Sequence, residues 1–101
     1  MPEKSLALDE HTGAHVAELF RAFSDTSRVR ILSAIVDQEL NVTALAQAVG
    51  ISESAVSHHL RGLRQMRLVK ARRDGKEVNY RLEDEHIIAL FQQGVRHIQE
   101  G

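Results

Sequence analysis

The stretch that decides the fold runs Val49-Gly50-Ile51-Ser52-Glu53-Ser54-Ala55-Val56-Ser57-His58-His59-Leu60. Gly50 suits the left-handed backbone position just beyond a helix end, and Ser52 is a good N-cap for the helix that follows. In that second helix Val56, Leu60 and Leu63 recur at the spacing of one buried face. A shorter apolar pattern precedes Gly50. The stretch therefore predicts two helices joined by a tight turn, a helix-turn-helix.

The period of the apolar residues changes after this pair of helices. Residues 68–72 and 78–82 are strand-like, and Asp74-Gly75 between them is the strongest hairpin signal in the chain. A hairpin directly after a helix-turn-helix would form a wing beside the second helix.

Helices are also predicted on both sides of this unit. Apolar spacing indicates one helix near residues 16–23 and another that begins after a cap at Thr26 or Ser27. Downstream, Asp84 can cap a last helix, whose apolar residues are Ile87, Ile88, Phe91, Val95 and Ile98. That face is broad for a small domain and favours burial against a second copy of the chain. The predicted fold class is mainly α with a β-hairpin wing, a homodimeric winged helix-turn-helix in the order ααααββα.

The composition is that of one globular domain. A chain of 101 residues, 43% apolar and 27% charged, predicts a single domain over residues 1–101, and we expect residues 1–10 to be flexible. The absence of cysteine excludes disulfides and thiolate metal sites. The longest apolar run, Ile87–Phe91, is too short to span a membrane, and the start of the chain lacks the pattern of a signal peptide. We therefore expect a cytoplasmic protein without a membrane partner.

Basic residues are concentrated in one segment, although the whole chain has a net charge of −1. Residues 61–81 hold eight Lys or Arg against two acidic residues. Such a block on a nearly neutral chain indicates an anion-binding face, and the alternative is a solvated charged face.

The exposed side of the second helix and the hairpin supply candidates for contacts with double-stranded DNA. Short polar groups in the N-terminal half of a recognition helix reach base edges, whereas Arg and Lys suit phosphates. The predicted DNA-binding residues are Ser54, Ser57, His58, Arg61, Arg64, Arg73 and Lys76. Arg67 and Arg72 are further candidates for phosphate contacts.

Four residues in the last segment suggest a metal site shared between two chains. His86 and His97 are eleven positions apart, so they share a helical face but lie about 16.5 Å apart along the axis. One helix cannot bring both rings to one ion, because each nitrogen must lie about 2.0–2.1 Å from Zn²⁺. Two antiparallel copies can, with Asp84 and Glu100 adding oxygens from the same ends. Four nitrogen and oxygen ligands suit Zn(II), with Co(II) as a substitute.

From about Val16 to Glu100 the chain resembles the ArsR/SmtB family of bacterial winged-helix metal-sensing repressors, and most closely its SmtB-type zinc sensors. The stretches that carry the resemblance are residues 23–32, residues 49–60, Leu68-Val69 and the pattern Asp84-x-His86…His97-x-x-Glu100.

The resemblance implies a homodimer that binds operator DNA without metal. It implies release of DNA when Zn(II) joins Asp84 and His86 of one chain to His97 and Glu100 of the other. It also implies a hydrogen bond from His97 to a backbone carbonyl near Arg67. Many relatives carry a cysteine about where this chain has Asn41, so sensing of arsenic, cadmium or lead through thiolates is disfavoured.

Two other functions stay open at this point. One is a repressor of the same family that senses no metal and uses residues 84–100 as a dimer surface. The other is a zinc hydrolase, which is disfavoured because four protein ligands leave no position for water and no catalytic motif is present. We therefore expect no enzyme activity. His11 and His15, at i and i+4, either add ligands for Ni(II) or form a polar helix face.

Overall fold

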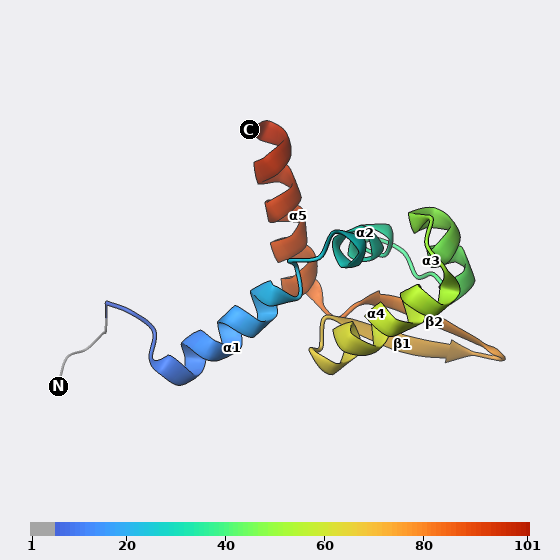
Figure 1. Cartoon of the computed structure of the whole chain (residues 1–101), viewed down its shortest axis with the longest axis horizontal. Coiled ribbons are helices and arrows are strands. Elements are labelled where there is room, and N and C mark those ends of the chain that lie inside the picture. Colours follow the sequence, from blue (N-terminus) through green and yellow to red (C-terminus); the bar gives the residue numbers. More distant parts are fainter. Residues whose placement is uncertain (1–5) are drawn as a thin grey trace.

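The computed structural model describes residues 6–101. Over this range the chain forms five helices and one β-hairpin in the predicted order, as Figure 1 shows. The elements are α1 (Glu10–Arg21), α2 (Thr26–Ala34), α3 (Val42–Val49), α4 (Glu53–Gln65), β1 (Val69–Asp74), β2 (Glu77–Leu82) and α5 (Glu85–Glu100). The predicted fold class, a mainly helical winged helix-turn-helix, is confirmed. The expectation that residues 1–10 are flexible falls partly on residues 1–5, which lie outside the described range, while Asp9 caps α1.

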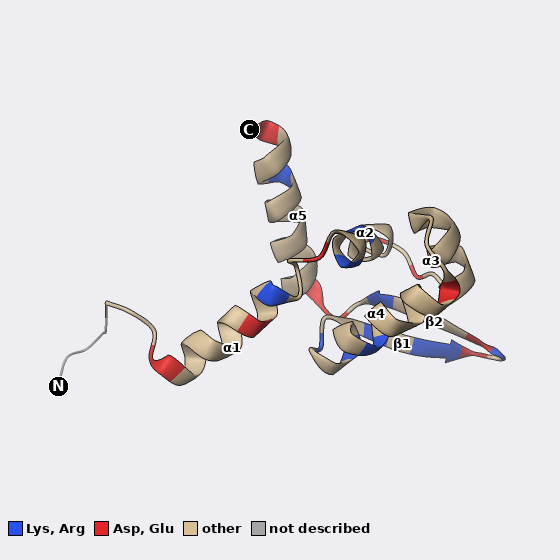
Figure 2. Ribbon diagram, viewed as in Figure 1, with Lys and Arg blue, Asp and Glu red and all other residues tan. Residues whose placement is uncertain are grey.

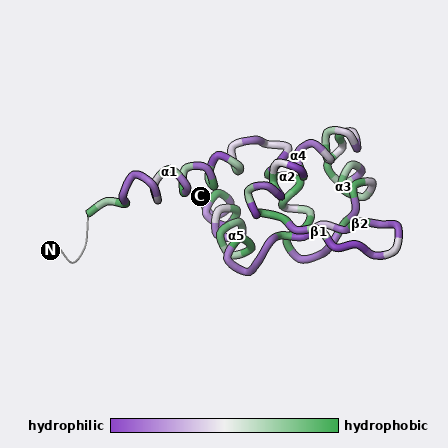
Figure 3. The backbone as a smooth tube through the Cα atoms, turned by 90° about the horizontal axis from the view of Figure 1, so that it is seen from below, coloured by the Kyte–Doolittle hydropathy of each residue, from purple (hydrophilic) through white to green (hydrophobic). Residues whose placement is uncertain are grey.

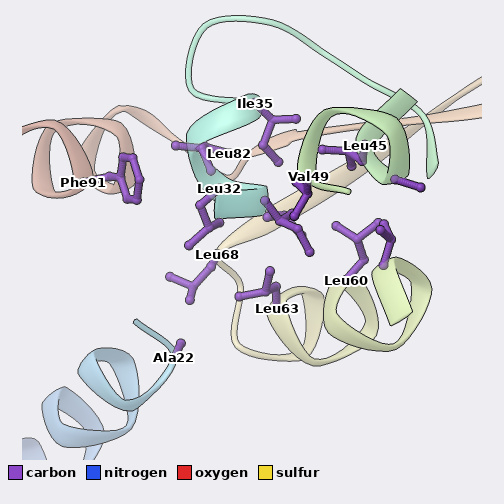
Figure 4. Close-up of a cluster of buried hydrophobic side chains, with 14 residues drawn as sticks. Ala22, Leu32, Ile35, Leu45, Val49, Leu60, Leu63, Leu68, Leu82 and Phe91 are labelled. Atoms are coloured by element: carbon purple, nitrogen blue, oxygen red, sulfur yellow. The ribbon is translucent and has the colours of Figure 1, made fainter. Parts of the chain in front are cut away.

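The hydrophobic core lies where α2, α3 and α4 meet the base of the hairpin (Figure 4). Its largest fully buried side chains are Ile31, Leu32, Ile35, Leu45, Leu60, Leu63, Leu68, Val56 and Val69. No polar or charged residue between positions 6 and 101 is buried. Val56, Leu60 and Leu63 all point into this core, so the predicted buried face of α4 is confirmed. The opposite face of the same helix is left open to a ligand.

The joint between α3 and α4 has the predicted chemistry. Gly50 adopts a left-handed backbone with φ 79°, and its N–H donates to the carbonyl of Ala46 at 2.8 Å. Ser52 caps α4 by accepting the N–H of Ala55 at 3.0 Å. Arg30 on α2 donates to the Val49 carbonyl at 2.8 Å, which satisfies an orphan acceptor at the end of α3. These bonds fix how α4 leaves α3.

The wing is an antiparallel pair in which Val69 lies opposite Leu82 and Asp74 lies opposite Glu77. The turn is therefore Gly75-Lys76, one residue later than the Asp74-Gly75 signal suggested. Gly75 has φ 65°, at the first central position of the turn, where a two-residue hairpin of type II′ requires glycine. Asp74 is drawn into the last pair of the ladder.

Local details of α2 and α3 differ from the sequence prediction. The cap of α2 is Asp25 rather than Thr26 or Ser27, because its carboxylate accepts the N–H of Arg28 at 2.9 Å. In α3 the apolar spacing predicts Leu45, Ala48 and Val49 inward. The structure buries Leu45, Ala46 and Val49 instead, and Ala48 faces solvent. The short helix thus turns a slightly different face to the core than its apolar pattern indicated.

The first and last helices extend from this body as two arms (Figure 1). In the single chain α1 buries none of its residues and α5 buries only Phe91. The rings of Phe23 and Phe91 lie 6.4 Å apart and join the bases of the arms. Figure 3 shows hydrophobic segments along α5, outside the winged body. Phe20, Val95 and Ile98 are 52%, 36% and 78% exposed, so the two arms present an apolar surface without a partner.

Candidate nucleic-acid interface and metal-ligand residues

The open face of α4 carries side chains predicted to contact DNA. Ser54, His58 and Arg61 are exposed and Ser57 is half-buried. Thr43 on α3 donates to the Glu53 carboxylate at 3.1 Å, which ties the start of α4 to the preceding helix. The structure therefore places the predicted residues on one surface of a well-anchored helix.

Basic side chains continue this surface onto the wing. Figure 2 shows Lys and Arg on the second half of α4 and along β1, while β2 carries one Arg. Arg64, Arg73 and Lys76 are all exposed. The arrangement places a row of cations beside the recognition helix, which suits the phosphate backbone of DNA.

Arg72 forms hydrogen bonds with a carboxylate of its own chain, Glu39. Its guanidinium donates to both oxygens of Glu39, at 2.7 Å from Nη2 and 2.9 Å from Nε to Oε1 and at 3.2 Å from Nε to Oε2. This hydrogen bond lowers the pKa of the Glu39 carboxyl and raises that of Arg72. The pair joins β1 to the loop between α2 and α3, and the Arg72 side chain is still 54% exposed, so its contact with phosphate stays a prediction.

Arg67 ends α4 in an unusual conformation. Its φ is 59°, in the left-handed region where a residue with a side chain is strained. The N–H of Leu68 donates to the Leu63 carbonyl at 2.9 Å, and the N–H of Glu83 donates to the Leu68 carbonyl at 2.9 Å. The recognition helix is thus connected through the backbone to the segment just before α5.

α4 also contacts the start of α2. His59 Nε2 lies 4.0 Å from the Asp25 carboxylate, the same group that caps α2. The backbone N–H of Arg28 lowers the pKa of the Asp25 carboxyl, with smaller contributions in the same direction from His59 and the Arg28 charge. Arg28 also donates to the carbonyls of Ala22 and Arg21 at 2.9 and 3.1 Å, so it braces the fold.

The four predicted metal ligands lie at opposite ends of α5. Asp84 caps the helix by accepting the N–H of Ile87 at 3.1 Å, and its Oδ1 lies 3.7 Å from Nδ1 of His86. His97 and Glu100 are in the last turn, where Glu100 lies 4.0 Å from Arg96. Within residues 6–101 no three His, Cys, Asp or Glu side chains come close enough to hold a metal ion. A single chain therefore brings together only Asp84 and His86.

The other two histidines considered for metal binding are on α1. The rings of His11 and His15 are 4.4 Å apart between centroids, and both are exposed. They face neither end of α5 closely enough to form a three-residue group in the described chain.

The fold and the basic face define a winged-helix DNA-binding regulator of transcription. Residues 25–71 match the family described as "Bacterial regulatory protein, arsR family". The chain is 48% identical over 96 residues to the "Transcriptional repressor SmtB homolog" of Synechocystis, which covers 95% of this chain and 71% of the relative. The chain belongs to the ArsR family: it is a DNA-binding transcriptional repressor and not an enzyme.

Solved structures agree with this assignment. The antimony-specific transcriptional repressor AntR is 31% identical with a TM-score of 0.84, covering 99% of this chain and 90% of that one. A homodimeric winged helix-turn-helix domain from Mycobacterium bovis, a possible ArsR-family regulator, is 28% identical with a TM-score of 0.80, covering 95% and 91%. No helix in the described part of this chain is long and apolar enough to cross a membrane.

Sequence reasoning missed the residues that attach the wing to the body. Leu40 and Tyr80 exchange two backbone hydrogen bonds, at 2.9 and 3.2 Å, and Glu39 holds Arg72 beside them. Residues 37–41 are mostly polar and their sequence predicts a loop, and no local pattern marks the bridge.

Proposed function

We propose that this chain is a metal-responsive repressor. Its metal-free homodimer binds operator DNA, and Zn(II) bound between the two α5 helices weakens that binding. The observation that carries the proposal is the placement of Asp84 and His86 at one end of α5 and of His97 and Glu100 at the other. Half of a tetrahedral ligand set stands at each end of a helix whose apolar face lacks a partner.

A second copy of the chain is the partner that completes this set. Val95 and Ile98 lie on the exposed apolar face of α5, beside Phe20 of α1. Covering that face with its own twofold mate removes apolar area from water on both chains at once. The homodimeric domain from Mycobacterium bovis, with a TM-score of 0.80 to this chain, supports that assembly. If the two helices run antiparallel, each His86 lies near the other chain's His97.

The donor set fits Zn(II). Two imidazoles and two carboxylates satisfy a tetrahedral ion, and Co(II) accepts the same ligands. The capping bond from Ile87 occupies Oδ1 of Asp84 and holds the carboxylate still, which leaves Oδ2 for a ligand. His86 and Asp84 are 94% and 49% exposed in the single chain, so both reach a partner surface. When bound, the ion would supply a cross-link between two subunits.

The residues around Asp84 connect this end of α5 with the DNA-binding face. Asp84 follows Glu83, whose N–H donates to Leu68, and Leu68 donates to the Leu63 carbonyl in α4. A change in the position of α5 therefore acts on the hairpin base and the recognition helix. Metal must favour a dimer whose two recognition helices no longer match the half-site spacing, and couplings of about 1–3 kcal/mol are typical.

A repressor that senses no metal is the second candidate. Glu100 lies 4.0 Å from Arg96 in the same helix, so its carboxylate has a use that needs no ion. In that case residues 84–100 form only a dimer surface.

The comparisons favour the metal-responsive candidate. The name of AntR, an antimony-specific repressor, supports control by an inorganic ion in a relative 31% identical to this chain. The absence of cysteine in this chain argues for nitrogen and oxygen ligands instead of thiolates.

The experiment compares His97→Ala with the parent in DNA binding with and without saturating Zn²⁺. The probe is a duplex that the parent protein selects from a random library. We expect His97→Ala to bind the duplex without metal and to keep it when zinc is added, while the parent releases it. Gln93→Ala, an exposed residue of the same helix outside the predicted ligand set, is the matched control and should release the duplex like the parent. If zinc releases His97→Ala from the duplex as it releases the parent, the proposal of a metal switch at α5 is wrong.

A further inference from the structure

A hollow opens between the recognition helix and the wing. It has a volume of about 530 Å³ and is lined by Ser57, Leu60, Arg61, Arg64, Gln65 and Tyr80. Ser57, Arg61 and Arg64 stand at i, i+4 and i+7, so they form one stripe of α4 along the hollow. The lining contains two guanidinium groups, an amide and two hydroxyls, but no carboxylate. These donors suit an anionic ligand.

Tyr80 is the only lining residue that comes from the wing. Its backbone lies in the middle of β2, opposite Ala71 on one side and bonded to Leu40 on the other. The two bonds with Leu40, from each N–H to the other carbonyl, measure 2.9 and 3.2 Å. The Tyr80 side chain is half-buried and packs against the hydrophobic core. The ring therefore stands on a rigid base.

The phenolic hydroxyl of Tyr80 reaches solvent. Every buried side-chain nitrogen or oxygen in the described chain has a hydrogen-bond partner, and this hydroxyl forms no bond with another described residue. A tyrosine that packs its ring on a core keeps a polar tip for a second contact. Tyr80 lines the hollow together with Arg61 and Arg64.

The geometry of a winged helix identifies the anion. α4 enters the major groove and the hairpin follows the backbone, so the space between them faces a phosphodiester strand. α4 contributes Arg61 and Arg64 to the lining of this hollow, and the wing contributes Tyr80.

We propose that Tyr80 is a DNA-binding residue, whose hydroxyl donates a hydrogen bond to a backbone phosphate held in the hollow beside Arg64. The contact links the wing to the same phosphate that the recognition helix touches. It fixes the position of the hairpin on DNA without reading sequence, because every nucleotide presents that phosphate. The contact needs only the DNA-binding activity of the chain and does not depend on a metal.

The test measures the affinity of metal-free Tyr80→Phe for a duplex selected by the parent from a random library. Loss of one hydroxyl from each subunit should weaken binding by about 100-fold or more, since two hydrogen bonds to charged phosphates are lost per dimer. The slope of affinity against salt should stay unchanged, because no charge is removed. The melting temperature should also stay unchanged, because phenylalanine keeps the packed ring. Ser33→Ala, which removes a hydroxyl on α2 outside the hollow, should bind like the parent.

A second measurement locates the phosphate. The parent and Tyr80→Phe are titrated with duplexes in which one phosphate at a time is replaced by a neutral methylphosphonate. At one position in each half-site, replacement should weaken the parent more than the variant, because the variant has already lost that contact. Parent-like affinity of Tyr80→Phe overturns the proposal. A loss of affinity that is equal at every replaced phosphate, or that comes with a lower melting temperature, also overturns it and assigns Tyr80 to packing alone.

Discussion

Replacing Ile98 by alanine should dissociate the proposed dimer without unfolding the subunit. Ile98 is 78% exposed in the single chain and lines an apolar groove with Phe20, Phe23 and Val95. Because its side chain contributes little to the core of its own subunit, the free energy of unfolding of the subunit should change little. Alanine is also the better helix former.

The expected size follows from the area that the dimer would cover. The substitution removes three carbons, each worth about 0.8 kcal/mol on full burial. With 78% of the side chain exposed before association, the loss is about 1.9 kcal/mol per subunit. Two copies give about 3.7 kcal/mol per dimer, or roughly a 500-fold rise in the dissociation constant.

Sedimentation equilibrium of the metal-free parent and variant over a range of concentrations measures this constant. Gln93→Ala is the matched control, because Gln93 is exposed and lies on the opposite side of α5 from the apolar stripe. It should dimerise like the parent. If Ile98→Ala and Gln93→Ala have the same dissociation constant as the parent, the apolar face of α5 is not the dimer interface. The proposal of a metal site shared between two α5 helices would then lose its structural support.

Two further predictions concern the wing and its surroundings. Arg61→Ala combined with Lys76→Ala removes four cations per dimer, which should lower the salt slope of DNA binding by up to about 3.6, while Arg96→Ala on α5 should leave it unchanged. A parent-like slope in the double variant would mean that these side chains do not contact phosphates. Glu39→Gln should lower the melting temperature at neutral pH, because the pKa of Glu39 is held below its ordinary value of 4.5 by Arg72, so the carboxylate stabilises the fold above that pH. The difference in melting temperature should shrink as the pH falls through that depressed pKa, and a difference that persists unchanged at pH 2 would contradict the assignment.

The features that the sequence predicted well depend on neighbours in the chain. Ser52 and Asp84 each cap a helix because a short polar side chain can reach an N–H three residues ahead. Gly50 marks the turn because glycine accepts a positive φ without cost. Four capping types stand in a row at Ser24-Asp25-Thr26-Ser27, and the sequence could not choose between them. The carboxylate of Asp25 makes the bond.

The features that the sequence missed depend on distant residues. Glu39 and Arg72 are 33 positions apart, and no periodicity connects them. The bond between Leu40 and Tyr80 forms only because the loop after α2 passes the outer edge of β2. The same reasoning explains why the ligand set stays a proposal. Its two halves stand at opposite ends of α5, and only a second chain can bring them together.

The start of α5 is bonded to the DNA-binding body of its own subunit, whereas its end is exposed. This difference decides which parts of the dimer a shared metal ion would connect. At the start, Asp84 caps the helix and follows Glu83, which is bonded to Leu68, while Phe91 is 8% exposed against the core. Toward the end, Ile98 is 78% exposed, and the body of its own subunit does not hold it. In an antiparallel pair, a shared ion would therefore join the free end of one helix to the anchored end of the other. What such a link fixes is the position of one winged body relative to its partner. A dimer binds its operator only when the distance between its two recognition helices matches the spacing of the two DNA half-sites.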